Sequence, residues 1–201
     1  MADPAGCDAV RRQARAWLEA NALLLDTETT GLGDDAEVVE LAVIDCAGAV
    51  LLDTLVRPSG PVPAEAAAIH GITDAMLADA PTWSEIHARF CDLVEGRQVV
   101  IYSREFDTRV ITQTARRYGL PAPQGFDLVL DPGRIHCAMQ AYAEFRGEWS
   151  AEKGRYRWQK LSAAAQQQGV TVTNAHRALG DCLMTLGLVR AMASPGNAQG
   201  V

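Results

Sequence analysis

The chain has 201 residues, of which 48% are hydrophobic and 21% charged, and its formal net charge is −7 at pH 7. This length and composition suit a single domain with a substantial buried core. The negative charge counts against a protein that coats or slides along nucleic acid by means of a global positive field, but it does not exclude an enzyme that grips a strand terminus through bound cations.

The sequence carries neither a membrane span nor a zinc motif. No apolar run approaches the ~18 residues of a membrane span, and the first residues, MADPAGCDAVRRQARAW, lack the apolar centre of a secretion signal. The five cysteines are scattered, without a CxxC pair or a Cys/His spacing suited to zinc. We therefore expect a soluble, cytoplasmic protein with reduced thiols and no membrane partner.

The first half of the chain predicts one helix followed by three strands. An amphipathic helix is expected at residues 9–20, after a flexible segment at 1–8. Apolar runs at 22–29, 37–46 and 50–58 predict strands, the last two joined by a tight turn at Ala47 and Gly48. Short connections of this kind favour an antiparallel meander.

The second half alternates helices with strands. The expected elements are helices at 64–71 and within 79–96, a strand at 98–103, a helix at 106–118, a fifth extended segment at 126–131, helices at 138–145, 161–168 and 178–193, and a flexible tail at 194–201. Residues 146–160 read as an insertion in one domain of residues 9–193. This order predicts an α/β domain with a mixed central sheet of about five strands flanked by helices.

The first strand ends in acids, in the sequence LLLDTETTGL. Residues i and i+2 of a strand share a face, so Asp26 and Glu28 project together while Thr27 points the other way. Two adjacent carboxylates raise each other's pKa unless a cation lies between them, and Mg²⁺ prefers such oxygen ligands. Taken alone, the segment is explained nearly as well by a polar strand end that leads into a glycine turn.

Two further acids and a histidine lie later in the chain. Asp107 follows the fourth expected strand, where open α/β sheets commonly build a site, although a lone Asp at a helix start is more often a cap. Asp181 follows His176 by five residues, a rotation of about 140° on a helix, so the two cannot share one helix face. His176 is therefore expected in a loop or first turn, where an isolated histidine is more often a surface residue.

Together these motifs resemble a known family. DxE before a Thr-Thr-Gly-Leu turn, FD after a later strand and H-x4-D near the C-terminus are similar to the DEDDh 3′-to-5′ exonucleases, which include the proofreading exonuclease of bacterial replicative DNA polymerases. The resemblance spans residues 22–192 and implies an RNase H-like fold. By matching position, it implies that His176 is the general base. The implied metal ligands are Asp26, Glu28, Asp107 and Asp181.

The resemblance also implies contacts with a terminal nucleotide. The implied residues are Thr29, Leu32, Glu65, Ile69, His70 and Ser103. The segment AEAAAIHGIT resembles the family loop that encloses this nucleotide, and Thr29 and Leu32 match the turn that meets the 3′ hydroxyl and wedges against the last base. The chain departs from the family within the second motif. Where relatives often carry the asparagine of HNAxFD, this chain has Ser103, followed by Arg104.

The implied chemistry is metal-dependent hydrolysis. Two Mg²⁺ or Mn²⁺ ions ~4 Å apart would clamp the attacking and leaving oxygens, and His176 would accept a proton from water, releasing nucleoside 5′-monophosphates. The expected substrate is a single-stranded 3′ end of DNA or RNA; the resemblance favours DNA, whereas the residues themselves do not distinguish the two. A polymerase or another replication or repair protein is a candidate partner.

Two other functions stay open from the residues. A Mg²⁺-dependent phosphomonoesterase would use Asp26 as a covalent nucleophile, although that chemistry typically uses DxD rather than DxE. A non-catalytic nucleic-acid-binding module has no physical reason to keep all five acid and base residues.

The insertion at 146–160 interleaves aromatic with basic residues. They are Trp149, Tyr156 and Trp158, with Lys153, Arg155, Arg157 and Lys160. Aromatic faces can stack on bases while the cations meet phosphates, which would add contacts to a single strand. The aromatic side chains can equally anchor the insertion on the core with the charges facing water. The sequence leaves both interpretations open.

Overall fold

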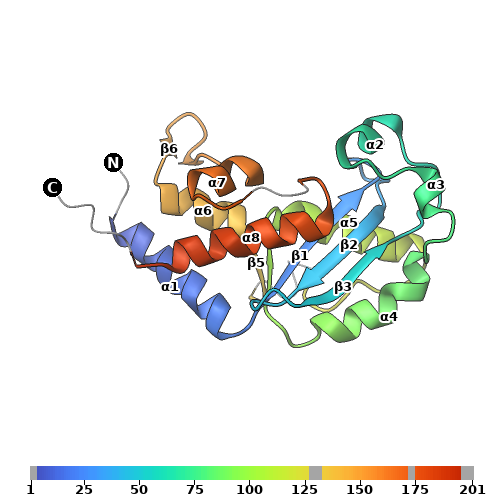
Figure 1. The fold of residues 1–201 in the computed structure, drawn as a ribbon, viewed down its shortest axis with the longest axis horizontal. Helices are drawn as coiled ribbons and strands as arrows, with labels where there is room; N and C mark the ends of the chain where they lie inside the picture. The colour runs from blue at the N-terminus through green and yellow to red at the C-terminus, as the bar shows by residue number, and fades with distance from the viewer. Residues whose placement is uncertain (1–3, 127–132, 172–174, 196–201) are drawn as a thin grey trace.

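A five-stranded mixed sheet forms the centre of the computed structural model, which describes residues 4–126, 133–171 and 175–195 (Figure 1). The strands are β1 (Leu23–Thr29), β2 (Val38–Ile44), β3 (Val50–Leu55), β4 (Val99–Ile101) and β5 (Ile135–Cys137), in the order β3-β2-β1-β4-β5. The first three are antiparallel, which confirms the predicted meander, and β4 and β5 continue the sheet parallel to β1.

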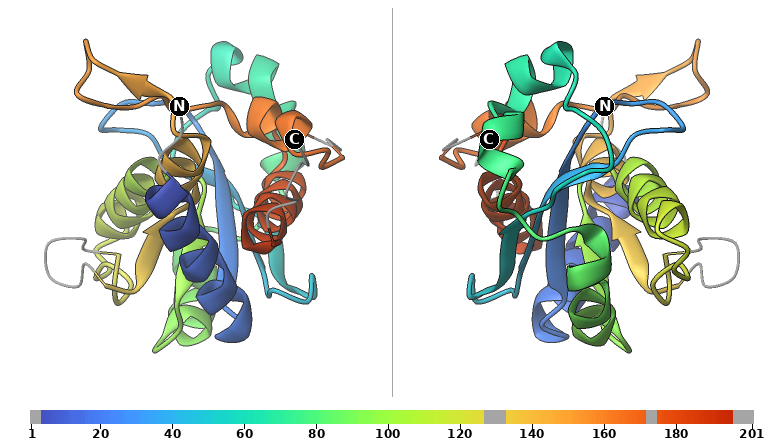
Figure 2. Two further views of the ribbon diagram at one scale, coloured as in Figure 1. Left: turned by 90° about the vertical axis from the view of Figure 1, so that its left-hand side faces the viewer. Right: turned by 90° about the vertical axis from the view of Figure 1, so that its right-hand side faces the viewer.

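Helices cover both faces of this sheet (Figures 1 and 2). One face carries α1 (Pro4–Glu19), α6 (Ala138–Arg146), α7 (Leu161–Gln167) and α8 (Ala178–Ala193). The other face carries α4 (Trp83–Val94) and α5 (Arg104–Arg117). Two short helices, α2 (Ala64–His70) and α3 (Asp74–Leu77), lie between β3 and α4 in the chain, and a small hairpin of β6 (Trp149–Ser150) and β7 (Arg155–Tyr156) follows α6.

The alternation along β1 determines which face each side chain joins. Leu24 packs into the cluster that contains α1, α6 and α8, whereas Leu23 and Leu25 pack against α4 and α5. Asp26 and Glu28 continue the row of Leu24. The strand therefore presents both carboxylates on the side covered by α8, as the spacing predicts.

The structure places the start of two helices that the sequence left open or put elsewhere, and it contains one short helix that was not predicted. The first helix begins at Pro4, so residues 4–8 are helical rather than flexible; a proline is compatible with a first turn, where its missing N–H needs no partner in the helix. The expected helix within 79–96 begins at Trp83, because the N–H of Thr82 donates to the Glu85 carboxylate at 2.7 Å and caps that end. Residues 74–77 form a short helix that the sequence pattern did not predict.

The fifth strand also differs. It lies at Ile135–Cys137, and three residues are too short to show a strand periodicity in the sequence. Of the segment expected to supply this strand, 126–131, only Phe126 belongs to the described residues. Of the N-terminal segment and tail expected to be flexible, residues 1–3 and 196–201 likewise lie outside them.

The structure also bears on the expected state of the cysteines and on the expected absence of a membrane span. All five cysteines are free thiols. Across the described ranges, no helix has both the length and the apolar composition required to cross a membrane.

Candidate active site

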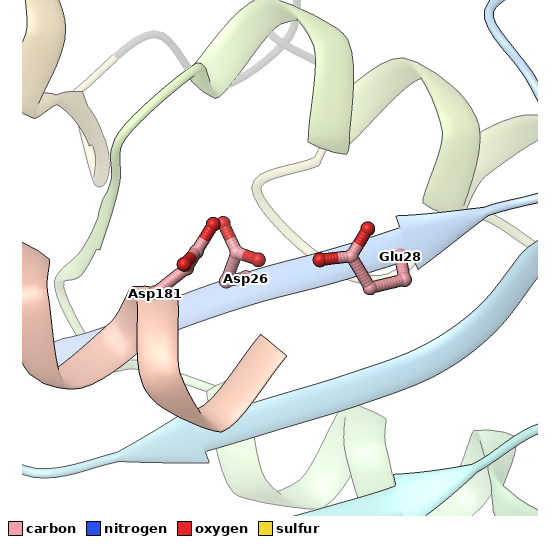
Figure 3. Close-up of side chains that lie close together, drawn as sticks. All are labelled: Asp26, Glu28 and Asp181. Atoms are coloured by element: carbon pink, nitrogen blue, oxygen red, sulfur yellow. The ribbon is translucent and has the colours of Figure 1, made fainter. Parts of the chain in front are cut away.

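Three carboxylates converge where β1 meets the start of α8. Asp26 and Glu28 project from β1 toward Asp181 in the first turn of α8, and one oxygen from each lies within 4.8 Å of the others (Figure 3). The sequence places Asp181 more than 150 residues after this strand, and the packing of α8 on β1 closes that separation. The structure thus brings together three of the four predicted metal ligands.

Asp107 approaches the cluster from the opposite side of β1. It lies in the first turn of α5, is 3% exposed, and accepts a hydrogen bond of 2.7 Å from the hydroxyl of Thr27. Its oxygens are not among those that lie within 4.8 Å of one another. Burial and then the charge of Asp107 raise the pKa of Asp26 well above its ordinary value, so the fourth carboxylate acts on the same site.

The electrostatics of the site call for a cation. Burial, followed by repulsion from Asp181 and Glu40, raises the pKa of Glu28 to about 8. Burial raises the pKa of Asp107 to about 7, against the hydrogen bond from Thr27, which lowers it. These carboxylates therefore repel one another when ionised, and a bound divalent cation would remove that cost. An all-oxygen donor set fits Mg²⁺ or Mn²⁺.

His176 occupies the turn directly before α8, as predicted. Its backbone has a positive φ of 64°, which is uncommon for a residue other than glycine, and its side chain is exposed. Its backbone N–H donates to Oδ1 of Asp181 at 3.3 Å. The main chain of His176 therefore helps to orient Asp181, while the imidazole ring faces solvent.

Glu40 and Arg177 form a pair that the sequence analysis missed. Glu40 stands opposite Glu28 in the register of β1 and β2 and is 3% exposed. Its carboxylate accepts hydrogen bonds from Nε of Arg177 at 3.0 Å and from the backbone N–H of Ala178 at 2.8 Å. A glutamate within the apolar strand VVELAVI is costly to bury without a charged partner. Its position in the sequence was therefore the signal that could have indicated such a pair.

A cavity of about 420 Å³ adjoins the carboxylates and shares Glu28 with them. Five of the six predicted substrate contacts line it, namely Thr29, Leu32, Glu65, Ile69 and His70. Leu32 is 79% exposed and Ile69 is 62% exposed, so two large apolar side chains of this wall face solvent. His70 is buried, which lowers its pKa, and its Nδ1 accepts a hydrogen bond of 3.0 Å from the N–H of Ile72.

Ser103 does not line this cavity, so its contact with substrate stays a prediction. It lies immediately before α5, where its carbonyl accepts the N–H of Asp107 at 3.2 Å. Phe106 lines the cavity instead. Arg109 lies over the Phe106 ring at 5.5 Å and donates to the carbonyl of Leu32 at 3.0 Å, which ties the loop after β1 to α5.

Comparison with known proteins agrees with this geometry. Residues 23–189 match the RNase_T family model, described as exonuclease. The chain is 52% identical over 190 residues to an uncharacterized exonuclease, CP81, of Escherichia phage 186. The aligned residues cover 94% of this chain and 96% of that protein. It is 35% identical over 175 residues to a DNA polymerase III subunit epsilon-like protein of Rhodobacter capsulatus, covering 81% of this chain but only 22% of that one.

A solved structure of Exonuclease X in complex with 5′ overhanging duplex DNA is also similar, with 30% identity, a TM-score of 0.59, and coverage of 85% of this chain and 90% of that chain. The five-stranded mixed sheet together with this neighbour confirms the RNase H-like fold. The family depends on divalent metal ions, in agreement with the carboxylate cluster. The chain therefore belongs to the RNase_T exonuclease family and is a nuclease that resembles the DEDD exonucleases, as its sequence motifs predicted.

Proposed function

We propose that the protein is a 3′-to-5′ exonuclease that removes nucleoside 5′-monophosphates from single-stranded 3′ ends of DNA, using two Mg²⁺ or Mn²⁺ ions. The observation that carries this proposal is the carboxylate cluster beside a cavity, with Glu28 belonging to both. A substrate in that cavity would have its reactive phosphate next to the bound cations.

The chain's own residues divide the chemistry between them. The ions would be held by Asp26, Glu28, Asp107 and Asp181. When bound, the metals would activate a water molecule and stabilise charge on the departing 3′ oxygen. His176, on the turn before α8, would accept the proton of that water, and its exposed ring is free to do so.

The cavity suits a terminal nucleotide. Its volume of about 420 Å³ falls within the ~300–1,000 Å³ range of small-molecule sites. The exposed side chains of Leu32 and Ile69 offer apolar surface to a base, while Thr29 and Glu65 offer oxygens to the sugar hydroxyl. A site that encloses the end of a strand favours exonucleolytic over internal cleavage.

The cellular setting belongs to the same proposal. Relatives named DNA polymerase III subunit epsilon support a role in DNA proofreading or repair, with a polymerase or another replication or repair protein as partner. We propose that the protein acts in the cytoplasm. Cell fractionation tests this location.

A single-stranded DNA oligonucleotide with a 5′ label tests the proposal directly. With Mg²⁺ we expect stepwise shortening from the 3′ end, and little shortening of a strand whose 3′ end carries a phosphate. Removal of a terminal phosphate alone would instead favour the phosphomonoesterase, and an unchanged strand would favour the binding module. Equal cleavage of a circular strand would reveal an endonuclease, and a matched RNA strand measures the preference for DNA.

A further inference from the structure

We propose that residues 148–160, here called the aromatic hairpin, form a second nucleic-acid site that holds single-stranded DNA upstream of the 3′ end being cleaved. The inference rests on the proposed function. The aromatic hairpin contains β6 and β7 and projects from the body of the molecule on the same side as α2 (Figures 1 and 2). The site is separate from the cavity beside the carboxylates, because the two share no lining residue.

The stretch of chain that contains the aromatic hairpin has a charge opposite to that of the whole chain. Residues 146–160 contain five basic and two acidic side chains, a local charge of +3 in a chain whose net charge is −7. An acidic nuclease must still hold a polyanion, and a local basic patch is the means by which such a chain can do so. The aromatic hairpin lies within this basic stretch.

The aromatic hairpin also encloses a cavity of about 540 Å³. Its lining combines cations with aromatic rings: Lys153, Arg155, Arg157, Tyr156 and Trp158. Glu148 and Glu152 line it as well, and Glu148 is already paired with Arg146. Cations beside rings are the chemistry that binds single strands, because phosphates meet the charges while bases stack.

The exposure of the tryptophans distinguishes the two interpretations that the sequence left open. Trp17 and Trp83 are fully buried, whereas Trp149 is 57% exposed and Trp158 is 43% exposed. Rings that only anchored the hairpin on the core would be buried like the first two. Trp149 instead contacts Tyr156 edge-on at 5.2 Å, within the hairpin itself, which leaves ring surface for a nucleobase.

Arg155 provides an independent indication of an anion-binding position. Its guanidinium lies 3.3 Å from the centroid of the Trp158 ring, so both groups are held in one stack in the wall of the cavity. Its Nη1 is shielded from solvent and has no hydrogen-bond partner among the residues that the structure describes. A buried, unpaired N–H of a charged group is costly, and a phosphate oxygen would satisfy it.

The aromatic hairpin is attached to the residue that follows β4, an internal strand of the sheet that carries the active site. The hydroxyl of Tyr102 donates to the carbonyl of Gln159 at 2.7 Å. Tyr102 follows Ile101, which pairs with Leu25, the residue before Asp26. The end of the aromatic hairpin is therefore held beside the strand end that supplies the first metal ligand, so one DNA strand can contact both sites.

Binding without cleavage tests the site by itself. Fluorescence anisotropy of a 5′-labelled oligo-dT of about 30 nucleotides, in EDTA, should show weaker binding for Trp158→Ala and Trp149→Ala, by about 5- to 150-fold for each lost stacking ring. Arg155→Ala should also lower the slope of log Kd against log salt by about 0.7, the value for one phosphate contact on a single strand. Trp158→Phe should bind nearly as the wild type does.

The matched control is Arg89→Ala, which removes one exposed positive charge from α4, at the far side of the molecule (Figure 1). It should leave binding unchanged. Thermal unfolding verifies that each variant is folded. If an alanine variant is not folded, binding by Arg155→Lys and Trp158→Phe is measured in its place. Equal binding by the wild type and the folded hairpin variants, or equal loss in Arg89→Ala, would overturn the inference.

Hydrolysis separates this site from the proposed function. The p-nitrophenyl ester of thymidine 5′-monophosphate is too short to reach the aromatic hairpin, so its kcat and KM should be equal in wild type and hairpin variants, while KM for the long strand rises. If the wild type hydrolyses neither substrate, the proposed exonuclease function fails and the anisotropy result still decides the aromatic hairpin. If KM rises equally for both substrates, the aromatic hairpin is not a separate strand site.

Discussion

Glu40 and Arg177 join the second strand of the sheet to the start of the last helix, directly beside the carboxylate cluster. Nε and Nη2 of Arg177 donate to Oε1 of Glu40 at 3.0 and 2.5 Å, and Nε also donates to Oε2 at 3.1 Å, although the two residues are 137 positions apart in the chain. The charge of Glu40 raises the pKa of Glu28, and the charge of Arg177 lowers it by a smaller amount, so the arginine offsets part of the repulsion that Glu40 adds to the site.

Removal of this ion pair should destabilise the attachment of α8 to the sheet without replacing a proposed metal ligand. We expect Glu40→Ala to lower the free energy of unfolding, because the Ala178 N–H and the Arg177 guanidinium lose their partner. Removing one partner of a fully buried pair costs about 3–5 kcal/mol, and the loss should be smaller here because 43% of the Arg177 side chain is exposed.

Glu40→Gln is the matched variant, since it keeps a hydrogen-bond acceptor and removes the charge. It should retain more stability than Glu40→Ala, and both should need more Mn²⁺ for half-maximal activity because Asp181 is less firmly placed. Urea unfolding and metal titrations measure the two effects. Unchanged stability and metal dependence in Glu40→Ala would contradict this assignment.

The metal-free protein should become less stable as the pH rises. The pKa of Glu28 is raised from 4.5 to about 8, chiefly by burial, so the folded state binds more protons than the unfolded chain between these values. This contribution to stability is fully present below about pH 4.5, is lost progressively as the pH rises, and is gone above about pH 8. Urea unfolding in EDTA across this range measures the loss.

Metal binding should reverse this trend and release protons. A cation binds the ionised carboxylates, so its affinity should increase as the pH rises toward 8. Calorimetry of Mn²⁺ binding in buffers of different ionisation enthalpy counts the released protons. A metal affinity that is constant from pH 6 to 8 would show that the raised pKa values do not belong to the metal site.

Replacement of the acidic ligands should remove activity but not folding. Asp26→Asn, Asp107→Asn and Asp181→Asn should each abolish turnover by weakening metal binding. Asp26→Asn should in addition raise the stability of the metal-free protein at pH 8, because asparagine is neutral and folding no longer carries the cost of burial and of repulsion by Asp107 and Asp181 that raises the pKa of Asp26. Activity assays and unfolding in EDTA give the two readings, and lower metal-free stability in Asp26→Asn would argue against mutual repulsion.

His176 should affect the rate without affecting the metals. His176→Asn is the suitable variant, because asparagine tolerates the positive φ of 64° better than alanine does. Its backbone N–H can still donate to Asp181. Loss of a general base should slow single-turnover cleavage by about 10²- to 10⁴-fold, while Mn²⁺ affinity stays near the wild-type value. Wild-type rates, or lost metal binding, would show that His176 is not the base.

The local pattern of the chain was enough to predict much of the site. Period-2 alternation along residues 22–29 places Asp26 and Glu28 on one face, and this holds in the structure because strand geometry depends only on neighbouring residues. The five-residue spacing from His176 to Asp181 likewise excluded a shared helix face. The antiparallel meander follows from short connections between apolar runs.

Packing between distant segments decided the rest. Glu40 finds Arg177 only when α8 lies on β2, and Asp107 meets Thr27 only when α5 covers the other face, so neither contact has a trace in local periodicity. The fifth strand of three residues is recognisable only by its parallel pairing with β4. Whether the rings of the aromatic hairpin were buried or exposed was also undetermined, because burial depends on what the rest of the chain packs against them.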